Sequence, residues 1–564
     1  MKRYPYYVAA TLLVLACGGG ESSPGGSGGS GPGTGGSQSG TGGSQTGTGG
    51  SSPGTGGAQP GTGGSVAGTG GSGAGGAGTD AKPGTGGTPG TGGTIVAGGF
   101  DYLERNGDIA KSGYSVRPML TKARVMAGLA ADAGFNATFQ GGVWSSPLYM
   151  EKGPNNKGAF FVATASNSVY ALDETTGAVI WTYNSLGAPR NTPACGCCDY
   201  GIPQGMYGTP VIDAASRTLF AVGALGNGFA AVGLNIDTGM PRAGWPVMIP
   251  GNASTNQRTA LGLVKGILYI AFGGHQGDCG DYHGAVVGIN IATPTMRGTW
   301  TASGSQSAIW GAGGLASDGD GVFAITGNGS GNGGGHGDSE EVIRITGLGT
   351  ANKTNANYFY PANWQAMDGG DLDFGCNAAT VFNVPGATPA KYLAAPAKDG
   401  HMYFLDAANL GGMAGEKFDL VTSQSGMSTR TSPTAYMTTS GMFVAISTNA
   451  ARCPMGSAAT GNVIMGVQVT VNAGAIAPKI AWCAARNGDF TAPISTSSDA
   501  AGTDALVWYG STGGGIRAVD GVTGAAVASV NAGCGMRRWG APIVGGAARI
   551  VVAADGKLCS WSVK

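Results

Sequence analysis

The chain has 564 residues, of which 111 are glycine and only 11% are charged, and its 31 basic residues balance its 31 acidic ones. This balance excludes the global basic field that would recruit nucleic acid or an anionic membrane surface. The composition is also divided along the chain, so that a core can form only after about residue 98.

The N-terminus has the layout of an export signal. Two basic residues precede an apolar run over residues 6–15 that is too short to span a bilayer, and the run leads to Ala16 and Cys17. A small residue directly before a cysteine resembles the lipobox of bacterial lipoproteins. This resemblance implies a signal peptide over residues 1–16, a lipid on Cys17, and an exported chain anchored at the outer membrane or cell surface. An ordinary signal peptide cut near Ala16 is the alternative.

Residues 17–97 consist almost entirely of Gly, Ser and Thr, and a segment of this composition cannot bury a core. We therefore expect a disordered linker. As a flexible coil it would average about 50 Å from end to end. The folded domain is expected to be residues 98–564, held clear of the membrane.

After the linker, short strand-like runs alternate with turns, and a strand opening of small residues recurs eight times at intervals of roughly 50 to 65 residues, a period that indicates a propeller or solenoid. Small residues would let the innermost strands crowd toward an axis, and proline is tolerated where a strand begins. The openings are residues 145–148, 208–211, 259–262, 311–314, 377–380, 431–434, 491–494 and 540–543.

Each opening starts a unit of several strands. In the first unit three more strand-like runs follow, at residues 159–164, 168–173 and 178–182. Four strands per unit is the composition of a propeller blade. We predict an all-β fold: a single eight-bladed β-propeller of four-stranded antiparallel blades, with seven blades as the alternative. The last unit has room for three strands, so residues 137–140 should supply the fourth and close the ring.

The segment 169–181 resembles the repeat of propellers of the pyrroloquinoline-quinone (PQQ) type, and weaker copies lie at 233–239, 401–406 and 516–524. In each copy an Asp should cap the turn, a Gly should take a positive φ, and an aromatic should close over the blade edge. Over most of residues 110–564 the chain resembles secreted bacterial PQQ-repeat lipoproteins of poorly defined function. Outer-membrane assembly factors share this type of propeller.

Nine cysteines remain besides the one that would carry a lipid, and an exported chain makes disulfides the default expectation. The expected local pairs are Cys453 with Cys483 and Cys534 with Cys559, because the two members of each pair lie about one blade apart.

The adjacent Cys197 and Cys198 resemble the adjacent-cysteine disulfide of quinoprotein alcohol dehydrogenases, which covers one face of the quinone. The resemblance implies that both would contact the cofactor. Cys195 lies two residues away, and structural cysteines in a loop are the alternative that we favour.

His275, Cys279 and His283 are metal-ligand residue types at suggestive spacing, although the glycines around them argue against a helix that would align them. A hairpin loop whose cysteine joins a disulfide is the alternative. Residues 318–321 and 368–373 are rich in Asp and could bind calcium, but neither has the full spacing of a known calcium loop, so Asx turns are favoured.

Two functions fit this sequence. The first is a lipid-anchored surface or envelope propeller that acts as a binding or scaffold module for a protein or glycan partner, with no cofactor. The second is a PQQ- and calcium-dependent quinoprotein dehydrogenase for an alcohol or sugar. We favour the first because the family's catalytic and calcium-binding carboxylates and its quinone-stacking tryptophan cannot be placed by motif. We also expect a monomer that meets the membrane only through its lipid anchor and binds no nucleic acid.

Overall fold

The computed structural model describes residues 99–191, 203–275, 278–330, 335–424, 426, 428–457, 459–488, 490–531 and 533–563. The predicted signal peptide, the lipidation site Cys17 and the linker lie outside these residues. Across the described ranges, no helix is both long enough and apolar enough to cross a membrane.

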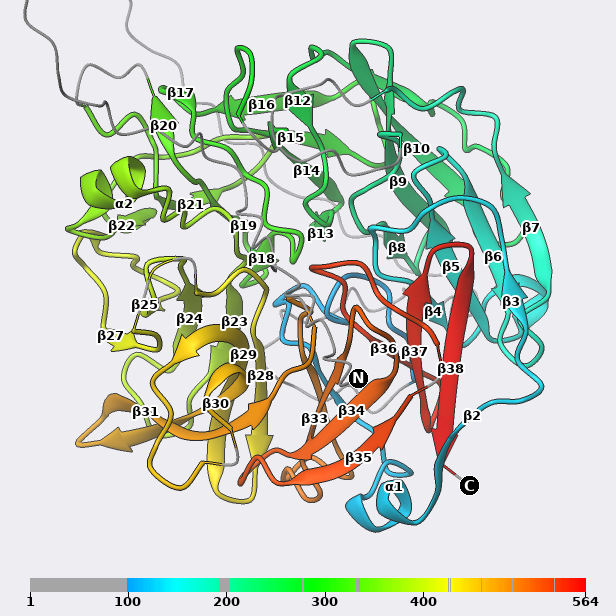
Figure 1. Cartoon of the computed structure of the whole chain (residues 1–564). Coiled ribbons are helices and arrows are strands. Elements are labelled where there is room, and N and C mark those ends of the chain that lie inside the picture. Colours follow the sequence, from blue (N-terminus) through cyan, green and yellow to red (C-terminus); the bar gives the residue numbers. More distant parts are fainter. Residues whose placement is uncertain are drawn as a thin grey trace, which may run out of the picture. The chain divides into compact units, whose positions relative to one another are not determined.

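Eight antiparallel sheets are arranged around a common centre as the blades of one propeller (Figure 1). The predicted all-β, eight-bladed fold is therefore confirmed. The strands of each blade are given from the innermost outward. Blade 1 consists of β4 (Leu148–Met150), β5 (Ala159–Ala163), β6 (Val169–Asp173) and β7 (Val179–Tyr183), and blade 2 consists of β8 (Val211–Asp213), β9 (Thr218–Leu225), β10 (Gly228–Asn235) and β11 (Val247–Ile249). Blade 3 consists of β13 (Gly262–Val264), β14 (Ile267–Gly274), β15 (Ala285–Asn290) and β16 (Arg297–Thr301), and blade 4 consists of β18 (Ala316–Ser317), β19 (Val322–Ile325), β21 (Val342–Ile345) and β22 (Tyr358–Tyr360).

Blades 5 to 8 continue the same order around the ring. Blade 5 consists of β23 (Thr380–Asn383), β24 (Lys391–Pro396), β25 (His401–Asp406) and β27 (Phe418–Val421), and blade 6 consists of β28 (Thr434–Thr438), β29 (Gly441–Ala451), β30 (Gly461–Asn472) and β31 (Ala475–Ala485). Blade 7 consists of β32 (Ile494–Ser497), β33 (Leu506–Gly510), β34 (Ile516–Asp520) and β35 (Ala526–Val530), and blade 8 consists of β36 (Ile543–Gly545), β37 (Arg549–Ala554) and β38 (Lys557–Val563).

A few short elements decorate this ring. Helix α1 (Lys122–Gly128) begins at Thr121, whose side chain accepts a hydrogen bond from the Arg124 amide and so caps the first turn. Helix α2 (Trp364–Gly370) links blades 4 and 5. The remaining elements are β1 (Tyr114–Val116), β12 (Thr255–Asn256), β17 (Ser305–Gln306), β20 (Gly329–Ser330), β26 (Gly412–Met413) and the 3-10 turn η1 (Pro154–Asn156).

The ring closes between the two ends of the domain. Strand β3 (Ala137–Thr138) pairs with β38, within the segment predicted to complete the last blade. The sequence did not indicate β2 (Leu129–Ala131), which also pairs with β38, over Trp561–Val563. Both N-terminal strands are antiparallel to β38, so they cover the outer edge of the last blade.

Small residues at the openings do allow the inner strands to approach closely. A Cβ added to Gly313 would lie 2.5 Å from the Ser432 Cβ and 2.7 Å from the Ala378 Cβ. One added to Gly311 would lie 1.9 Å from the Asn377 carbonyl oxygen. Real Cβ atoms cannot approach this closely, so the openings of blades 4, 5 and 6 can converge only because glycine stands at these positions.

The predicted Asp cap is observed at three of the four copies. Asp173, for example, accepts hydrogen bonds from the amides of Thr175 and Thr176 at 3.0 and 2.8 Å. In the copy at 233–239 the prediction was wrong in detail, because Asn235 and not Asp237 caps the turn. An amide oxygen accepts the same two bonds, so the turn is preserved without the carboxylate.

An N-terminal plug, which we define as residues 101–117, lies against the inner strands of the ring. Its backbone exchanges hydrogen bonds with the inner strands of blades 1, 2, 4, 5, 6 and 7 in ring order. Two of its side chains reach the other blades: Lys111 donates to the Leu261 carbonyl before blade 3, and Arg105 donates to the Trp539 carbonyl before blade 8. Buried Lys111 also forms an ion pair with Glu104. One short segment thus ties all eight blades together.

Two disulfides lie in the C-terminal half, Cys453–Cys483 and Cys534–Cys559. These are the two local pairs that the sequence predicts. Cys376 is buried, and its thiol donates to the Thr429 carbonyl oxygen.

Candidate functional site

A large side chain stands directly before seven of the eight small-residue openings and a cysteine before the other, and these side chains surround the axis at the end where the inner strands begin. The aromatic members form one buried cluster with Tyr282, and the sequence analysis did not identify this position. The signal was available, because the residue preceding all eight openings is large or polar. The eight residues are Trp144, Tyr207, Arg258, Trp310, Cys376, Arg430, Phe490 and Trp539.

Arg258 lies at the centre of this ring. Its guanidinium carbon is 4.5 Å from the ring centre of Trp310 and 4.7 Å from that of Trp539, and its Nε donates to the Trp310 carbonyl at 2.9 Å. Trp144 stacks on Trp539 with ring centres 5.5 Å apart. Arg258 therefore makes cation–π contacts with both indole rings and places a positive charge at this end of the axis.

A carboxylate and lysine cluster lies beside Trp310. Lys398 is fully buried, forms an ion pair with Asp373, and lies 2.8 Å from an Asp371 carboxylate oxygen. Its ammonium nitrogen is also 5.6 Å from the ring centre of Trp310. Lys398 follows β24, and both aspartates follow α2, so the connections at one end of blades 4 and 5 bring the cluster together.

Further carboxyl groups surround this lysine. Glu340 is completely buried, and burial, reinforced by the charge of Asp373, raises its pKa well above the usual range. Burial also raises the pKa of Asp371 to about 7, against the opposing effect of Lys398. Asp278 contacts the Tyr282 hydroxyl at 2.6 Å, and burial together with Asp373 raises its pKa. Buried carboxyl groups that outnumber their cations are costly to fold, which is typical of functional sites.

Oxygen atoms that lack a hydrogen-bond donor point to a cation ligand. Asn328 uses its backbone amide to bond Asp373 at 3.1 Å and its side-chain amide to bond Asp371 at 3.3 Å. Among the residues that the structure describes, its buried Oδ1 atom has no hydrogen-bond partner, and the same is true of Glu340 Oε1. Amide and carboxylate oxygens are the ligands that calcium prefers. The donor set around Asn328, Asp371 and Asp373 therefore fits a hard cation.

The structure does not bring together the three side chains predicted from the sequence as a metal site. Cys279 is disulfide-bonded, so its sulfur is not a thiolate ligand. Nδ1 of His283 lies 3.0 Å from the Ala302 carbonyl oxygen. His275 is 2% exposed, and burial, with Arg190 and Arg258 nearby, lowers its pKa to about 4. The predicted cofactor contacts Cys197 and Cys198 lie outside the described residues.

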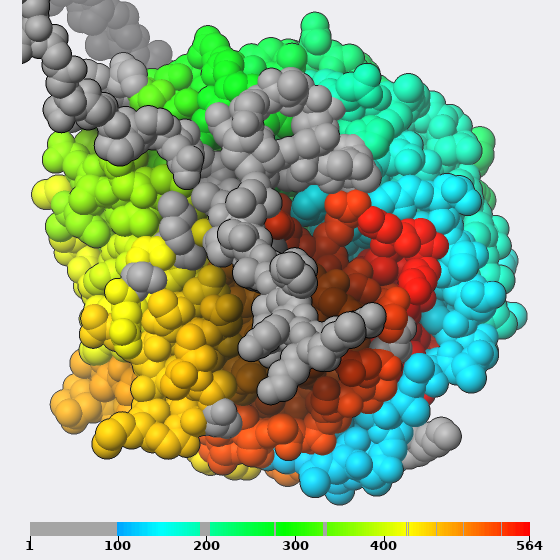
Figure 2. Space-filling view, in the orientation of Figure 1, coloured from blue at the N-terminus to red at the C-terminus, as the bar shows by residue number. Residues whose placement is uncertain are grey.

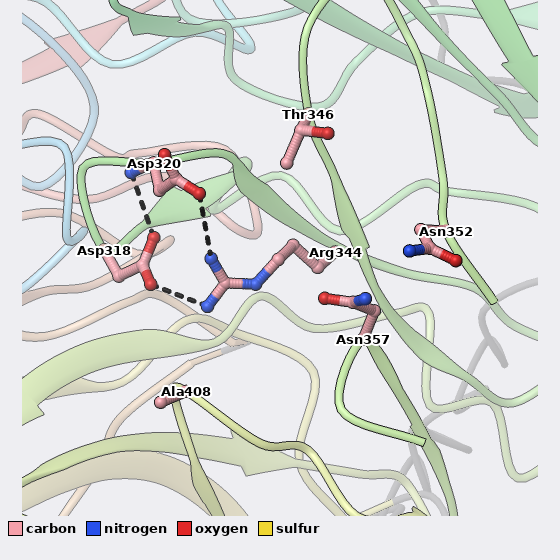
Figure 3. Close-up of a pocket in the computed structure, with 7 residues that line it drawn as sticks. All are labelled: Asp318, Asp320, Arg344, Thr346, Asn352, Asn357 and Ala408. Atoms are coloured by element: carbon pink, nitrogen blue, oxygen red, sulfur yellow. Dashed lines mark hydrogen bonds and ion pairs between the residues drawn. The ribbon is translucent and has the colours of Figure 1, made fainter. Parts of the chain in front are cut away.

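The two Asp-rich segments have different surroundings. Asp318 and Asp320 line a pocket of about 420 Å³ together with Arg344, whose guanidinium faces both carboxylates (Figure 3). Asp318 also accepts a hydrogen bond from the Asp320 amide at 3.1 Å, as an Asx turn requires. The segment 368–373 instead supplies two carboxylates of the axial cluster, so the sequence interpretation as simple turns missed its role.

The fold has well-matched relatives among solved structures. Quinohemoprotein alcohol dehydrogenase from Comamonas testosteroni is 14% identical, with a TM-score of 0.58 over 82% of this chain and 80% of that one. A europium-containing methanol dehydrogenase is 17% identical, with a TM-score of 0.56 over 80% of this chain and 89% of that one. At such identities the likeness shows the fold alone. No family model matches this chain, and no curated protein does.

Proposed function

We propose that the axial site binds PQQ together with a calcium ion and that the chain is a quinoprotein dehydrogenase for an alcohol or sugar. The observation that carries this proposal is the buried Lys398, paired with Asp371 and Asp373 beside the face of Trp310. These are convergent carboxylates, a cation and an indole ring at the axis of a propeller. The names of the similar alcohol and methanol dehydrogenases agree with the proposal.

The residues at the axis fit such a cofactor. PQQ is flat, aromatic and anionic, so Trp310 and Trp539 offer stacking surfaces and Arg258 offers a matching charge. Asn328 and Asp371 would hold calcium through oxygen atoms. When bound, the quinone supplies the two-electron acceptor for oxidation of a substrate hydroxyl.

The chain's own residues would handle the proton. Asp373 is 3% exposed, and the bond from Lys398 to one of its carboxylate oxygens holds the side chain in place. We assign to Asp373 the role of the base that takes the proton from the substrate hydroxyl. On the face shown in Figure 2 the ring is hollowed beside its orange and red blades, and we propose that the substrate enters there.

The experiment adds PQQ and CaCl₂ to the purified full chain and follows the quinone absorbance and dye reduction with ethanol and glucose. We expect binding and turnover, with turnover at least about 100-fold lower in Asp373→Asn. Asp419→Asn, which changes an exposed carboxylate at the blade edge, is the matched control and should retain full turnover. A chain that folds normally but binds no PQQ would instead support the binding-module function.

We also propose that the chain is exported and carries its lipid on Cys17, at the outer membrane or cell surface. The disulfides Cys453–Cys483 and Cys534–Cys559 support export, because such bonds persist in oxidising compartments. Mass spectrometry of the mature N-terminus tests the anchor, since a chain that begins with unmodified Gly18 or carries no lipid would contradict it.

A further inference from the structure

We propose that His336, Asp338 and Glu341 bind a first-row divalent metal ion such as Zn²⁺, which replaces the ammonium group of Lys353. This site is separate from the proposed cofactor site and does not depend on it. Within the ranges that the structure describes, these three residues are the one group of His, Cys, Asp and Glu side chains whose potential ligand atoms all lie within 4.8 Å of one another.

The three side chains are held in place by their surroundings. The His336 ring stacks on Tyr360 with ring centres 3.7 Å apart and meets the edge of Trp364 at 5.0 Å. Asp338 accepts a hydrogen bond from the Ser303 amide at 2.8 Å. Glu341 is fully buried at the entry to β21. Ligands that are already ordered lose little entropy when a metal binds.

The ligand atoms converge on a position that a cation already uses. Nδ1 of His336 lies 3.5 Å from a Glu341 carboxylate oxygen. Lys353 forms an ion pair with Asp338, and its ammonium lies 3.0 Å from Glu341. The Lys353 side chain is 38% exposed, and the long flexible arm of a lysine can move into solvent at modest cost. The lysine therefore occupies the cation position without being locked there.

The chemistry of the ligand set selects the kind of metal. His336 offers an imidazole nitrogen, and Asp338 and Glu341 offer carboxylate oxygens. One imidazole and two carboxylates suit Zn²⁺, Mn²⁺ or Co²⁺, whereas Mg²⁺ and Ca²⁺ prefer oxygen ligands alone. The spacing His-x-Asp-x-x-Glu is visible in the sequence at 336–341, but only the fold of the segment after residue 335 turns the three side chains toward one another.

Zinc titration of the full chain, freed of metal with EDTA, tests this inference. We expect one equivalent of Zn²⁺ to bind, and Co²⁺ to give ligand-field absorbance when it binds in the same place. His336→Gln should weaken zinc binding at least about tenfold. Lys353→Met should strengthen it, because no ammonium then competes for Asp338 and Glu341. Thermal melting of each variant checks that it is folded.

Two matched histidine variants distinguish this site from others. His401→Gln removes a histidine that pairs with Asp419 on blade 5, and zinc affinity should not change. His283→Gln removes one of the ligands predicted from the sequence and should also leave the affinity unchanged. The inference is overturned if neither the natural chain nor Lys353→Met binds an equivalent of zinc, if His336→Gln binds as tightly as the natural chain, or if binding depends on His283 instead.

Discussion

The two ends of the propeller channel contain buried lysines in contrasting surroundings. In the N-terminal plug, Lys111 pairs with one carboxylate, Glu104, and donates to the Leu261 carbonyl. At the axial site, Lys398 faces both Asp371 and Asp373, and the charge of Asp373 contributes to the raised pKa values of Glu340 and Asp278. One lysine paired with one carboxylate, as in the plug, is suited to holding structural elements together. Several carboxyl groups around a single ammonium are suited to a site that can bind a further cation.

The largest effect should come from breaking the balanced pair. Lys111→Met leaves the Glu104 carboxylate, 6% exposed, without its cation, and we expect a loss of about 3–5 kcal/mol in the free energy of unfolding. Urea unfolding measures this loss. PQQ affinity, where the chain binds PQQ, should stay within about twofold, because Lys111 does not contact the axial cluster.

The double variant Glu104→Gln/Lys111→Met is the control for this prediction. It removes both charges and keeps a similar volume, so it should recover part of the lost stability. If the double variant is less stable than Lys111→Met alone, the unpaired charge of Glu104 is not the cause of the lost stability.

Lowering the pH should reduce the free energy of unfolding through protonation of His275, near the axial site. Its pKa is lowered from 6.5 to about 4 by burial and the nearby arginines, so the unfolded chain takes up a proton first as pH falls. The stability contributed by the neutral ring is complete above pH 6.5 and is lost as pH falls toward 4, by up to about 3 kcal/mol. His275→Gln should flatten the unfolding free energy over this window.

His401 provides the opposite control for this pH profile. Its hydrogen bond to Asp419 raises the pKa of His401 in the folded protein. The stability that this bond contributes is therefore present at low pH and is lost as the pH rises through the pKa of the folded state. His401→Gln should therefore not reduce the loss in acid. If the profile of His275→Gln matches that of the natural chain, another group accounts for the acid sensitivity.

The sequence was sufficient for the architecture because propeller blades repeat local signals. Small residues recur at each opening, and the Asp or Asn turn recurs with them, as at Asp173 and Asn235. The plug could not be predicted, since residues 101–117 bind one blade after another by backbone hydrogen bonds that leave no periodic pattern.

The axial site was hidden for a different physical reason. Lys398 and Asp373 lie 25 residues apart on connections of neighbouring blades, and Arg258 comes from a third. Their convergence depends on the radial packing of the blades and not on any local spacing. A comparison of the residue before each opening would have found Trp310 and Arg258, but it would not have found Asp373 or Lys398.

The smallest expected effect concerns a contact between the two ends. Arg105 of the plug donates to the Ser146 hydroxyl and to the Trp539 carbonyl, both at 2.7 Å, so it links the plug to the indole that faces Arg258. Ser146→Ala removes one acceptor and should lower the free energy of unfolding by about 1 kcal/mol in urea. Because the bond to Trp539 remains, the axial site should keep its ligand affinity. A larger loss of affinity than of stability would show that the plug positions the axial indole, and the two ends would then have to be treated as one unit.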